Sequence, residues 1–170
     1  LAVEVERLEP LFCDQKEYEQ FIADHNRFSV KKGDISTYKG KCYLGIDAGS
    51  TTTKLAVVAE DGSLLFRFYD NNNGSPLKTS IRALKELNRV LPDTARIAGS
   101  CSTGYGEALI KSAFNLDYGE VETMAHYYAA AFFEPDVDCI LDIGGQDMKC
   151  IKIKNHAVDS VLLNEACSSG

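Results

Sequence analysis

The sequence predicts an α/β fold built from two units that open in the same way. Each unit begins with an apolar strand that ends on an aspartate, at Asp47 and at Asp142. A small glycine-containing turn and a second strand follow each aspartate, which is the pattern of a β-hairpin. Between the two openings, apolar residues recur with a period of 3.6 and predict helices. The first unit therefore has the order β-β-β-α-β-α-α.

In the first unit, strands are expected at 42–47, 55–59 and 64–69, and Asp61-Gly62 forms the turn between the last two. Ser75-Pro76 then begins a helix that ends at Leu91-Pro92. A short strand at 96–99 follows, and after it come helices that reach about Phe114 and run over 120–133. In the second unit, strands are expected at 139–142, 148–153 and 157–163.

The composition limits the classes of partner. The 170 residues are 45% hydrophobic and 25% charged, with a formal net charge of -7 and a pI near 5.0. No broad positive field is available for nucleic acid or anionic lipid. Because no apolar run approaches the roughly 20 residues that span a bilayer, we expect a cytoplasmic protein without a membrane partner. The six cysteines contain no C-x-x-C pair, so neither a zinc knuckle nor a disulfide framework is expected.

Three segments are predicted along the chain. Residues 1–41 form a connector with a helix, residues 42–136 form the first subdomain, and residues 137–170 begin a second one. The chain does not start with Met and stops within a glycine-rich turn, Cys167-Ser-Ser-Gly170. We therefore expect it to be a piece of a longer protein.

The segment Asp47-Ala-Gly-Ser-Thr-Thr-Thr-Lys54 has the residues that a nucleotide triphosphate with a metal ion requires. Glycine lets backbone N–H groups approach phosphate oxygens, Ser and Thr add hydroxyl donors, and aspartate holds hydrated Mg²⁺. A single segment of this kind is more readily a polar β-hairpin. The recurrence at Asp142-Ile-Gly-Gly-Gln-Asp147 instead favours a cleft in which two hairpins hold a phosphate chain from both sides. The Walker motif and an early G-x-G-x-x-G are both absent.

This architecture is similar to the actin-like ATPase (ribonuclease H-like) fold of the acetate and sugar kinase, Hsp70 and actin superfamily. Four segments carry a narrower resemblance, which covers roughly residues 43–170. They are Gly45-Ile-Asp-Ala-Gly-Ser-Thr-Thr-Thr-Lys54, Ser102-Thr-Gly-Tyr-Gly106, Asp142-Ile-Gly-Gly-Gln-Asp-Met-Lys149 and Asn164-Glu-Ala-Cys-Ser-Ser-Gly170. Their order resembles that of the 2-hydroxyacyl-CoA dehydratase activator and benzoyl-CoA reductase ATPase family.

The resemblance implies an oxygen-sensitive homodimer that carries one [4Fe-4S] cluster between its subunits. ATP hydrolysis would drive a low-potential electron into a dehydratase or reductase. Asp47 and Asp142 would position Mg²⁺ and the attacking water, and Gln146 would orient that water. The residues implied to hold phosphate are Gly49, Ser50, Thr51, Thr53 and Lys54, with Gly144 and Gly145 opposite. Gly104, in Thr103-Gly-Tyr-Gly106, would either line the cleft or cap a helix.

Cys167 matches the first cluster ligand of that family, although Ser168-Ser169 replace the usual pair of alanines. The second cysteine and the adenosine-binding segment of the family would lie beyond Gly170. We therefore expect this chain alone to bind ATP weakly and to be inactive. The leading segment resembles the connector of large proteins with two activator-like modules in tandem.

Two other functions remain open at this point. A phosphotransferase of the sugar or acetate kinase type would use the same hairpins, and Cys167 in its Asn-x-x-Cys context argues against it. An inactive structural module is disfavoured by the intact Asp47, Lys54, Asp142 and Gln146. Glu122 and His126 lie four residues apart on one predicted helix face, where a surface or capping hydrogen bond is expected before a metal or acid–base role.

Overall fold

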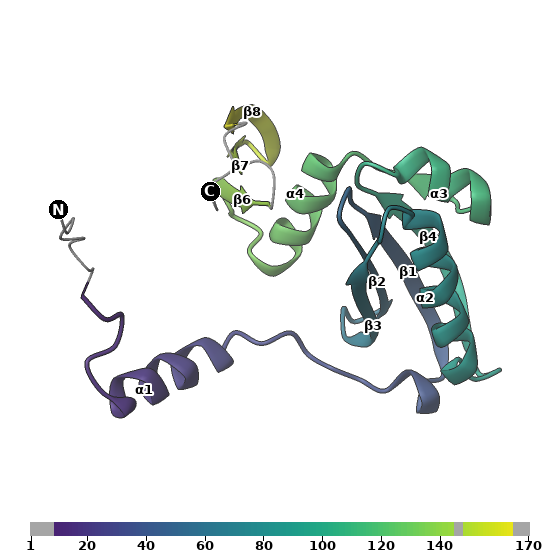
Figure 1. Cartoon of the computed structure of the whole chain (residues 1–170), viewed down its shortest axis with the longest axis horizontal. Coiled ribbons are helices and arrows are strands. Elements are labelled where there is room, and N and C mark those ends of the chain that lie inside the picture. The colour runs from purple at the N-terminus through teal and green to yellow at the C-terminus, as the bar shows by residue number, and fades with distance from the viewer. Residues whose placement is uncertain (1–8, 145–147, 165–170) are drawn as a thin grey trace, which may run out of the picture.

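In the computed structural model, residues 9–144 and 148–164 are described, and they form two β-sheets with a helix between them (Figure 1). The first sheet has five strands in the order β3-β2-β1-β4-β5. The second has three strands in the order β6-β7-β8. The predicted α/β class, with two units that each open with antiparallel strands, is confirmed.

The first three strands form an antiparallel meander. They are β1 (Gly40–Ala48), β2 (Thr52–Ala59) and β3 (Leu64–Asn71). Alternate residues of β1 and β2 are buried, as expected when one face of a sheet packs on a core and the other does not. The pairing register places Ile46 opposite Leu55 and Asp47 opposite Lys54. The register thus brings a carboxylate and an ammonium group together at one end of the hairpin.

The fourth strand is longer than expected. The structure extends β4 over Ala95–Thr103 instead of 96–99, so the prediction of a short strand is wrong. The cause is pairing with β1, because β4 runs parallel to β1 from Gly40 to Asp47 and its small polar residues find backbone partners there. The sequence reading also missed β5 (Tyr118–Gly119), a two-residue strand that pairs with β4.

Two helices cover one face of the first sheet (Figure 1). They are α2 (Pro76–Val90), which Ser75 caps, and α3 (Glu107–Phe114). The Ser75 hydroxyl accepts a hydrogen bond from the backbone N–H of Lys78, which is the role of an N-cap. The core that these elements bury together comprises Ile35, Cys42, Leu44, Ile46, Ala48, Leu55, Val57, Ala59, Leu65, Ala83, Leu87, Ile110 and Leu116.

The leading segment contains the expected helix, α1 (Gln15–Asn26), followed by a single 3₁₀ turn, η1 (Ile35–Thr37). Helix α1 buries none of its residues and lies away from both sheets (Figure 1). Farther on, Lys32 makes a parallel bridge to Leu64 at the start of β3. Among the described residues, no helix is both long and apolar enough to cross a membrane.

The second sheet consists of β6 (Cys139–Ile143), β7 (Met148–Lys154) and β8 (Ala157–Asn164). Asn155 and His156 both have positive φ, 53° and 57°, as the central residues of a type I′ hairpin turn require. Helix α4 (Glu122–Phe133) precedes this sheet and is joined to it by a hydrogen bond of 2.5 Å from the Tyr127 hydroxyl to the carbonyl of His156. This contact fixes the middle of α4 against the second unit.

Candidate functional site: two aspartates at the ends of β1 and β6

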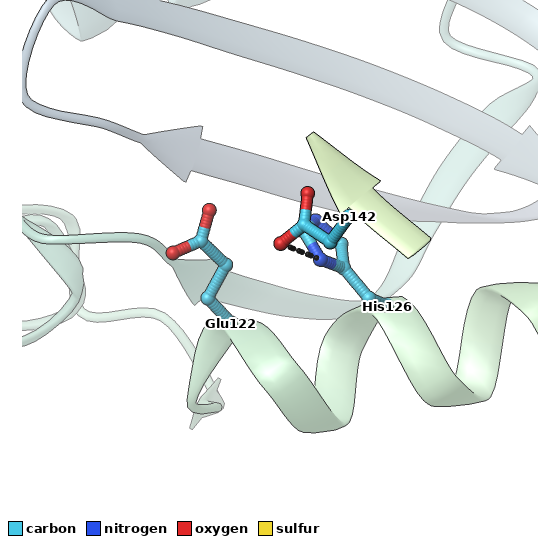
Figure 2. Close-up of side chains that lie close together, drawn as sticks. All are labelled: Glu122, His126 and Asp142. Carbon is cyan, nitrogen blue, oxygen red and sulfur yellow. Dashed lines mark ion pairs between the residues drawn. The ribbon is translucent and has the colours of Figure 1, made fainter. Parts of the chain in front are cut away.

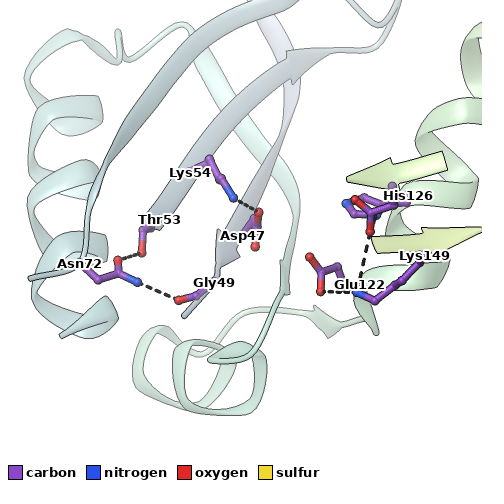
Figure 3. A network of polar contacts seen from close by, with 9 residues as sticks. Asp47, Gly49, Thr53, Lys54, Asn72, Glu122, His126 and Lys149 are labelled. Carbon is purple, nitrogen blue, oxygen red and sulfur yellow. Dashed lines mark hydrogen bonds and ion pairs between the residues drawn. The ribbon is translucent and has the colours of Figure 1, made fainter. Parts of the chain in front are cut away.

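Asp47 lies near the end of β1, where three strands meet. Its neighbours in the sheet are Lys54 on β2 and Thr103 on β4. The Lys54 ammonium lies 2.9 Å from Oδ2 of Asp47 (Figure 3). Both side chains are partly exposed, at 25% for Asp47 and 43% for Lys54. The pair is therefore accessible at the surface and is only weakly stabilising as an ion pair.

The second carboxylate oxygen of Asp47, Oδ1, accepts no hydrogen bond from Lys54. Oδ1 is buried, and no hydrogen-bond partner for it is found within the described part of the chain. A buried carboxylate oxygen without a partner is costly, and a hydrated cation is one group that would satisfy it. The position of Asp47 at a strand end thus fits the predicted role of this residue in holding Mg²⁺.

Gly104 makes room for this carboxylate. Its φ is +86°, and a Cβ at this position would lie 2.5 Å from Oδ1 of Asp47 and 2.8 Å from the carbonyl oxygen of Ala48. Both the backbone conformation and the close approach require glycine here. The structure therefore places Gly104 directly against Asp47.

We expect Gly104→Ala to lower the free energy of unfolding by about 2–4 kcal/mol, because the strain of a positive φ is added to a steric overlap. Gly74→Ala is the matched control. Gly74 has nearly the same φ, +82°, but has nothing within 4 Å of an added Cβ. Urea unfolding should show a loss of only about 1 kcal/mol for this control. Equal losses in the two variants would mean that the contact with Asp47 contributes nothing.

Hydrogen bonds made by the side chain of Asn72 stabilise the turn after Asp47. The side-chain amide of Asn72 donates a 2.7 Å hydrogen bond to the carbonyl of Gly49, and the Thr53 hydroxyl donates one of 2.6 Å to Oδ1 of Asn72 (Figure 3). Thr53 is fully buried, whereas Ser50 and Thr51 are exposed at the tip of the hairpin. In this structure Thr53 thus supports the hairpin and does not face solvent. The N–H of Gly49 is also used within the turn, since it donates to the carbonyl of Thr52 at 3.0 Å.

Removal of the Thr53 hydroxyl should therefore cost stability. In Thr53→Val, the buried Oδ1 of Asn72 loses its donor, and we expect a loss of about 1–3 kcal/mol in the free energy of unfolding. The neighbouring Thr52 is half-buried, and its replacement by valine should change the free energy by no more than about 0.5 kcal/mol. Urea unfolding of the two variants makes the comparison. A loss no larger in Thr53→Val than in Thr52→Val would show that this hydrogen bond does not hold the hairpin.

Helix α3 begins beside the same hairpin. The backbone N–H of Gly106, immediately before the helix, donates to the carbonyl of Ala48 at 2.8 Å. No side chain caps this helix start. Since a helix N-terminus carries partial positive charge, its position next to the hairpin favours an anion there.

Asp142 lies on β6 and faces α4. Figure 2 shows the side chains of Glu122, His126 and Asp142 close together, with the first two on the helix. Nδ1 of His126 lies 3.0 Å from Oδ2 of Asp142. The ammonium of Lys149, on β7, lies 3.3 Å from Oε2 of Glu122 and 3.8 Å from Oδ2 of Asp142. These four side chains, Glu122, His126, Asp142 and Lys149, are called the α4–β6 polar group below.

A helix-surface or capping hydrogen bond was expected for Glu122 and His126. Glu122 is 42% exposed and accepts a hydrogen bond from Lys149, whereas no side chain caps α4. His126 instead lies against Asp142 of the second sheet. The spacing of residues in the sequence could have indicated that Lys149 belongs to the α4–β6 polar group. Lys149 follows Asp142 by seven positions, as Lys54 follows Asp47. In both units the lysine is the direct cross-strand partner of the aspartate.

One ligand atom each from Glu122, His126 and Asp142 lies within 4.8 Å of the others, which is close enough for a shared divalent ion. However, the Lys149 ammonium already lies beside both carboxylates and balances one of the two negative charges. Mg²⁺ also prefers oxygen ligands to imidazole. The group as it stands is therefore better suited to hold Asp142 in place than to bind a metal ion with all three residues.

Cys139 and Cys150 lie close together on β6 and β7, with their sulfur atoms 3.7 Å apart. The hydrogen-bond contact with Cys150 raises the pKa of Cys139, and partial desolvation acts in the same direction. Iron–sulfur clusters bind thiolates, so a raised pKa makes Cys139 a poorer ligand at neutral pH. The predicted cluster ligand, Cys167, lies outside the described residues, as do Gly145 and Gln146. Gly144 directly follows β6 and is exposed.

The sequence profile of the BadF/BadG/BcrA/BcrD ATPase family matches residues 44–170. The chain belongs to this family. The match includes both strand-end aspartates and both cross-strand lysines.

Characterised proteins similar to this BadF/BadG/BcrA/BcrD ATPase family member include activators of dehydratases. The (R)-2-hydroxyglutaryl-CoA dehydratase activating ATPase of Acidaminococcus fermentans is 26% identical over 130 residues, which are 75% of this chain and 48% of the relative. The activator of lactoyl-CoA dehydratase of Anaerotignum propionicum is 30% identical over 129 residues, which are 75% of this chain and 48% of the relative. The chain thus spans about half the length of these relatives.

A solved structure of a similar activator has the same fold. The activator of the 2-hydroxyisocaproyl-CoA dehydratase from Clostridium difficile, with bound ADPNP, aligns with a TM-score of 0.63 at 26% identity. The alignment covers 75% of this chain and 47% of that structure. The predicted actin-like fold is thereby confirmed.

Proposed function

We propose that this protein is the ATPase part of an activator that couples ATP hydrolysis to low-potential electron transfer into a 2-hydroxyacyl-CoA dehydratase-type enzyme. The observation that carries the proposal is the end of β1. There a carboxylate with one lysine-paired oxygen and one buried, unpartnered oxygen lies beside a glycine hairpin and a helix start. Membership in the BadF/BadG/BcrA/BcrD ATPase family supports this assignment.

In this proposal, the first hairpin holds the phosphate chain. Gly49, Ser50, Thr51 and Lys54 contribute to phosphate binding, and the exposed hydroxyls of Ser50 and Thr51 are the groups best placed to donate. Thr53 acts indirectly by holding the hairpin through Asn72. Gly104 allows Asp47 to keep its position, and we also assign Gly144 and Gly145 to phosphate binding.

Hydrolysis requires a positioned water and a way to stabilise the charge that develops on the phosphate oxygens. We assign Asp142 and Gln146 to the water, and Asp47 with Asp142 to Mg²⁺. When bound, Mg²⁺ would neutralise phosphate charge and orient the phosphoryl group. The residues of the chain would supply the positioning, since phosphoryl transfer demands little covalent chemistry from the protein.

The electron-transfer part of the proposal concerns Cys167. We assign this residue as one thiolate ligand of a [4Fe-4S] cluster that two subunits of a homodimer share. The cluster would supply a one-electron centre whose potential depends on its surroundings. A dehydratase or reductase as electron acceptor belongs to the same proposal, and it rests on the resemblance to the activators of Acidaminococcus fermentans and Anaerotignum propionicum. We also propose a cytoplasmic location, because the sequence has no apolar run of the length that spans a bilayer.

Anaerobic iron–sulfur reconstitution of the full-length protein, followed by visible absorption and EPR, tests this function together with an ATPase assay of the same sample. We expect ATP hydrolysis that depends on Mg²⁺ and a cluster that is lost in Cys167→Ala. ATP hydrolysis without a cluster would contradict the electron-transfer assignment and favour a phosphotransferase. Absence of both nucleotide binding and hydrolysis would contradict the ATPase assignment itself.

A further inference from the structure

We propose that His126 and Lys149 are positioning residues that hold one oxygen of Asp142 and leave the other oxygen to the reaction. This inference rests on the proposed ATPase function, because it assigns a role at the same site. The sequence reading gave Lys149 no role and treated His126 as a helix-surface residue. The geometry of the α4–β6 polar group carries the inference.

His126 and Lys149 contact the same oxygen atom of Asp142. Nδ1 of His126 and Nζ of Lys149 approach Oδ2, at 3.0 Å and 3.8 Å, and neither of these contacts involves Oδ1. The side chains of Asp142 and Lys149 are mostly buried, at 18% and 14% exposed. A carboxylate anchored through one oxygen keeps its plane fixed, so the second oxygen points in a defined direction.

The first unit has the same arrangement. Lys54 approaches Oδ2 of Asp47, and Oδ1 of Asp47 is the oxygen without a partner among the described residues. Each lysine is the cross-strand partner of its aspartate, seven positions later in the chain. The two units thus repeat a strand pair in which a lysine holds one oxygen of a strand-end aspartate. The second unit adds His126 from α4 to the repeated pair.

The contact between His126 and Asp142 also indicates which ring nitrogen of His126 carries the proton. Nδ1 is buried and makes no well-aligned hydrogen bond with a described residue, yet it lies 3.0 Å from a carboxylate oxygen. A lone pair on Nδ1 would face the lone pairs of Oδ2 and repel them. A proton on Nδ1 makes the contact attractive, so we assign the Nδ1–H form of His126.

Kinetics of the full-length protein test the positioning role. His126→Ala should lower kcat for ATP hydrolysis by about 10–100-fold with little change in KM, since a misdirected carboxylate affects the reaction more than binding. His126→Asn should stay within about threefold of the wild type, because the asparagine amide nitrogen takes roughly the place of Nδ1. His126→Gln is the matched negative control, since its amide nitrogen takes roughly the place of Nε2. Equal losses in all three variants would show a merely structural role and overturn the inference.

Lys149→Met should also lower kcat by about 10–100-fold. In Lys149→Arg, the loss of kcat should be smaller, because the positive charge is kept. Lys152→Met is the control, because Lys152 is exposed on the same strand, β7. A rise in KM for ATP with unchanged kcat in Lys149→Met would mean that Lys149 binds the nucleotide, which would overturn its role as a positioning residue.

NMR provides a readout that does not depend on activity. Two-bond ¹H–¹⁵N correlations report which ring nitrogen carries the proton, and the chain has only three histidines, so the His126→Asn variant assigns the signal. We expect an Nδ1–H tautomer for His126 that changes in Asp142→Asn. An Nε2–H tautomer would overturn the inference, as would a shift of this signal on addition of Mn²⁺ or Zn²⁺ without nucleotide. Full-length wild-type protein that hydrolyses no ATP would contradict the proposed function, whereas the tautomer would still decide the His126 contact.

Discussion

Replacing Asp142 by asparagine is expected to lower kcat for ATP hydrolysis by about 10²–10⁴-fold, which is the range for loss of a group that positions or deprotonates a reacting water. Asparagine has nearly the same shape but lacks the negative charge that Mg²⁺ and the water require. It also removes the charge that Lys149 and His126 surround. A steady-state phosphate-release assay of the full-length protein with saturating Mg²⁺ and ATP measures the effect.

Asp159→Asn is the control for this variant. Asp159 is an exposed carboxylate on β8 of the same sheet, and its replacement should leave kcat within about twofold of the wild type. Retention of full activity by Asp142→Asn would remove Asp142 from the reaction. The proposal for His126 and Lys149 would then fail as well, because it depends on this carboxylate.

Replacing Leu55 by alanine is expected to lower the free energy of unfolding by about 2–5 kcal/mol. Leu55 is 1% exposed and lies opposite Ile46 in the centre of the first sheet. Its truncation leaves a cavity between the sheet and the helices that cover it. Urea unfolding followed by circular dichroism measures the change.

Leu109→Ala is the matched control, because Leu109 is 51% exposed on α3 and alanine is an equally good helix former. The loss there should be below about 1 kcal/mol. If the two variants lost the same stability, the packing at Leu55 would not be the main source of stability in this sheet.

The elements with strong local signals could be predicted from the sequence. Helix α2 was predicted because Ser75 and Pro76 mark its start, and the hairpins because alternating apolar residues flank short polar turns. The full length of β4 and the existence of β5 could not be predicted. The length of β4 depends on parallel pairing with β1, which is far away in the sequence, and β5 depends on parallel pairing with β4 across helix α3. The segment 100–103 is no more strand-like than a loop when read alone.

Only part of the candidate site could be predicted, because some of its contacts are local and others join elements that are far apart in the sequence. The motif around Asp47 lies within one hairpin, so its spacing in the sequence is also its spacing in the structure. By contrast, Asn72 reaches the hairpin from the end of β3, and Glu122 and His126 reach Asp142 from a separate helix. Such contacts depend on how helices and sheets pack. The repeated spacing of Lys149 was visible in the sequence, but its meaning depended on the strand register.

Helix α4 touches both sheets through different parts of its length. Tyr127 in its middle is bonded to the turn between β7 and β8. Near its end, Phe132 stands against the turn between β2 and β3, where an added Cβ on Gly62 would lie 2.3 Å from the phenyl ring. A helix of 12 residues is a rigid rod about 18 Å long. Any tilt of the second sheet should therefore be transmitted mechanically to the turn at Gly62, and a fluorescent label placed there would report the movement from outside the nucleotide site.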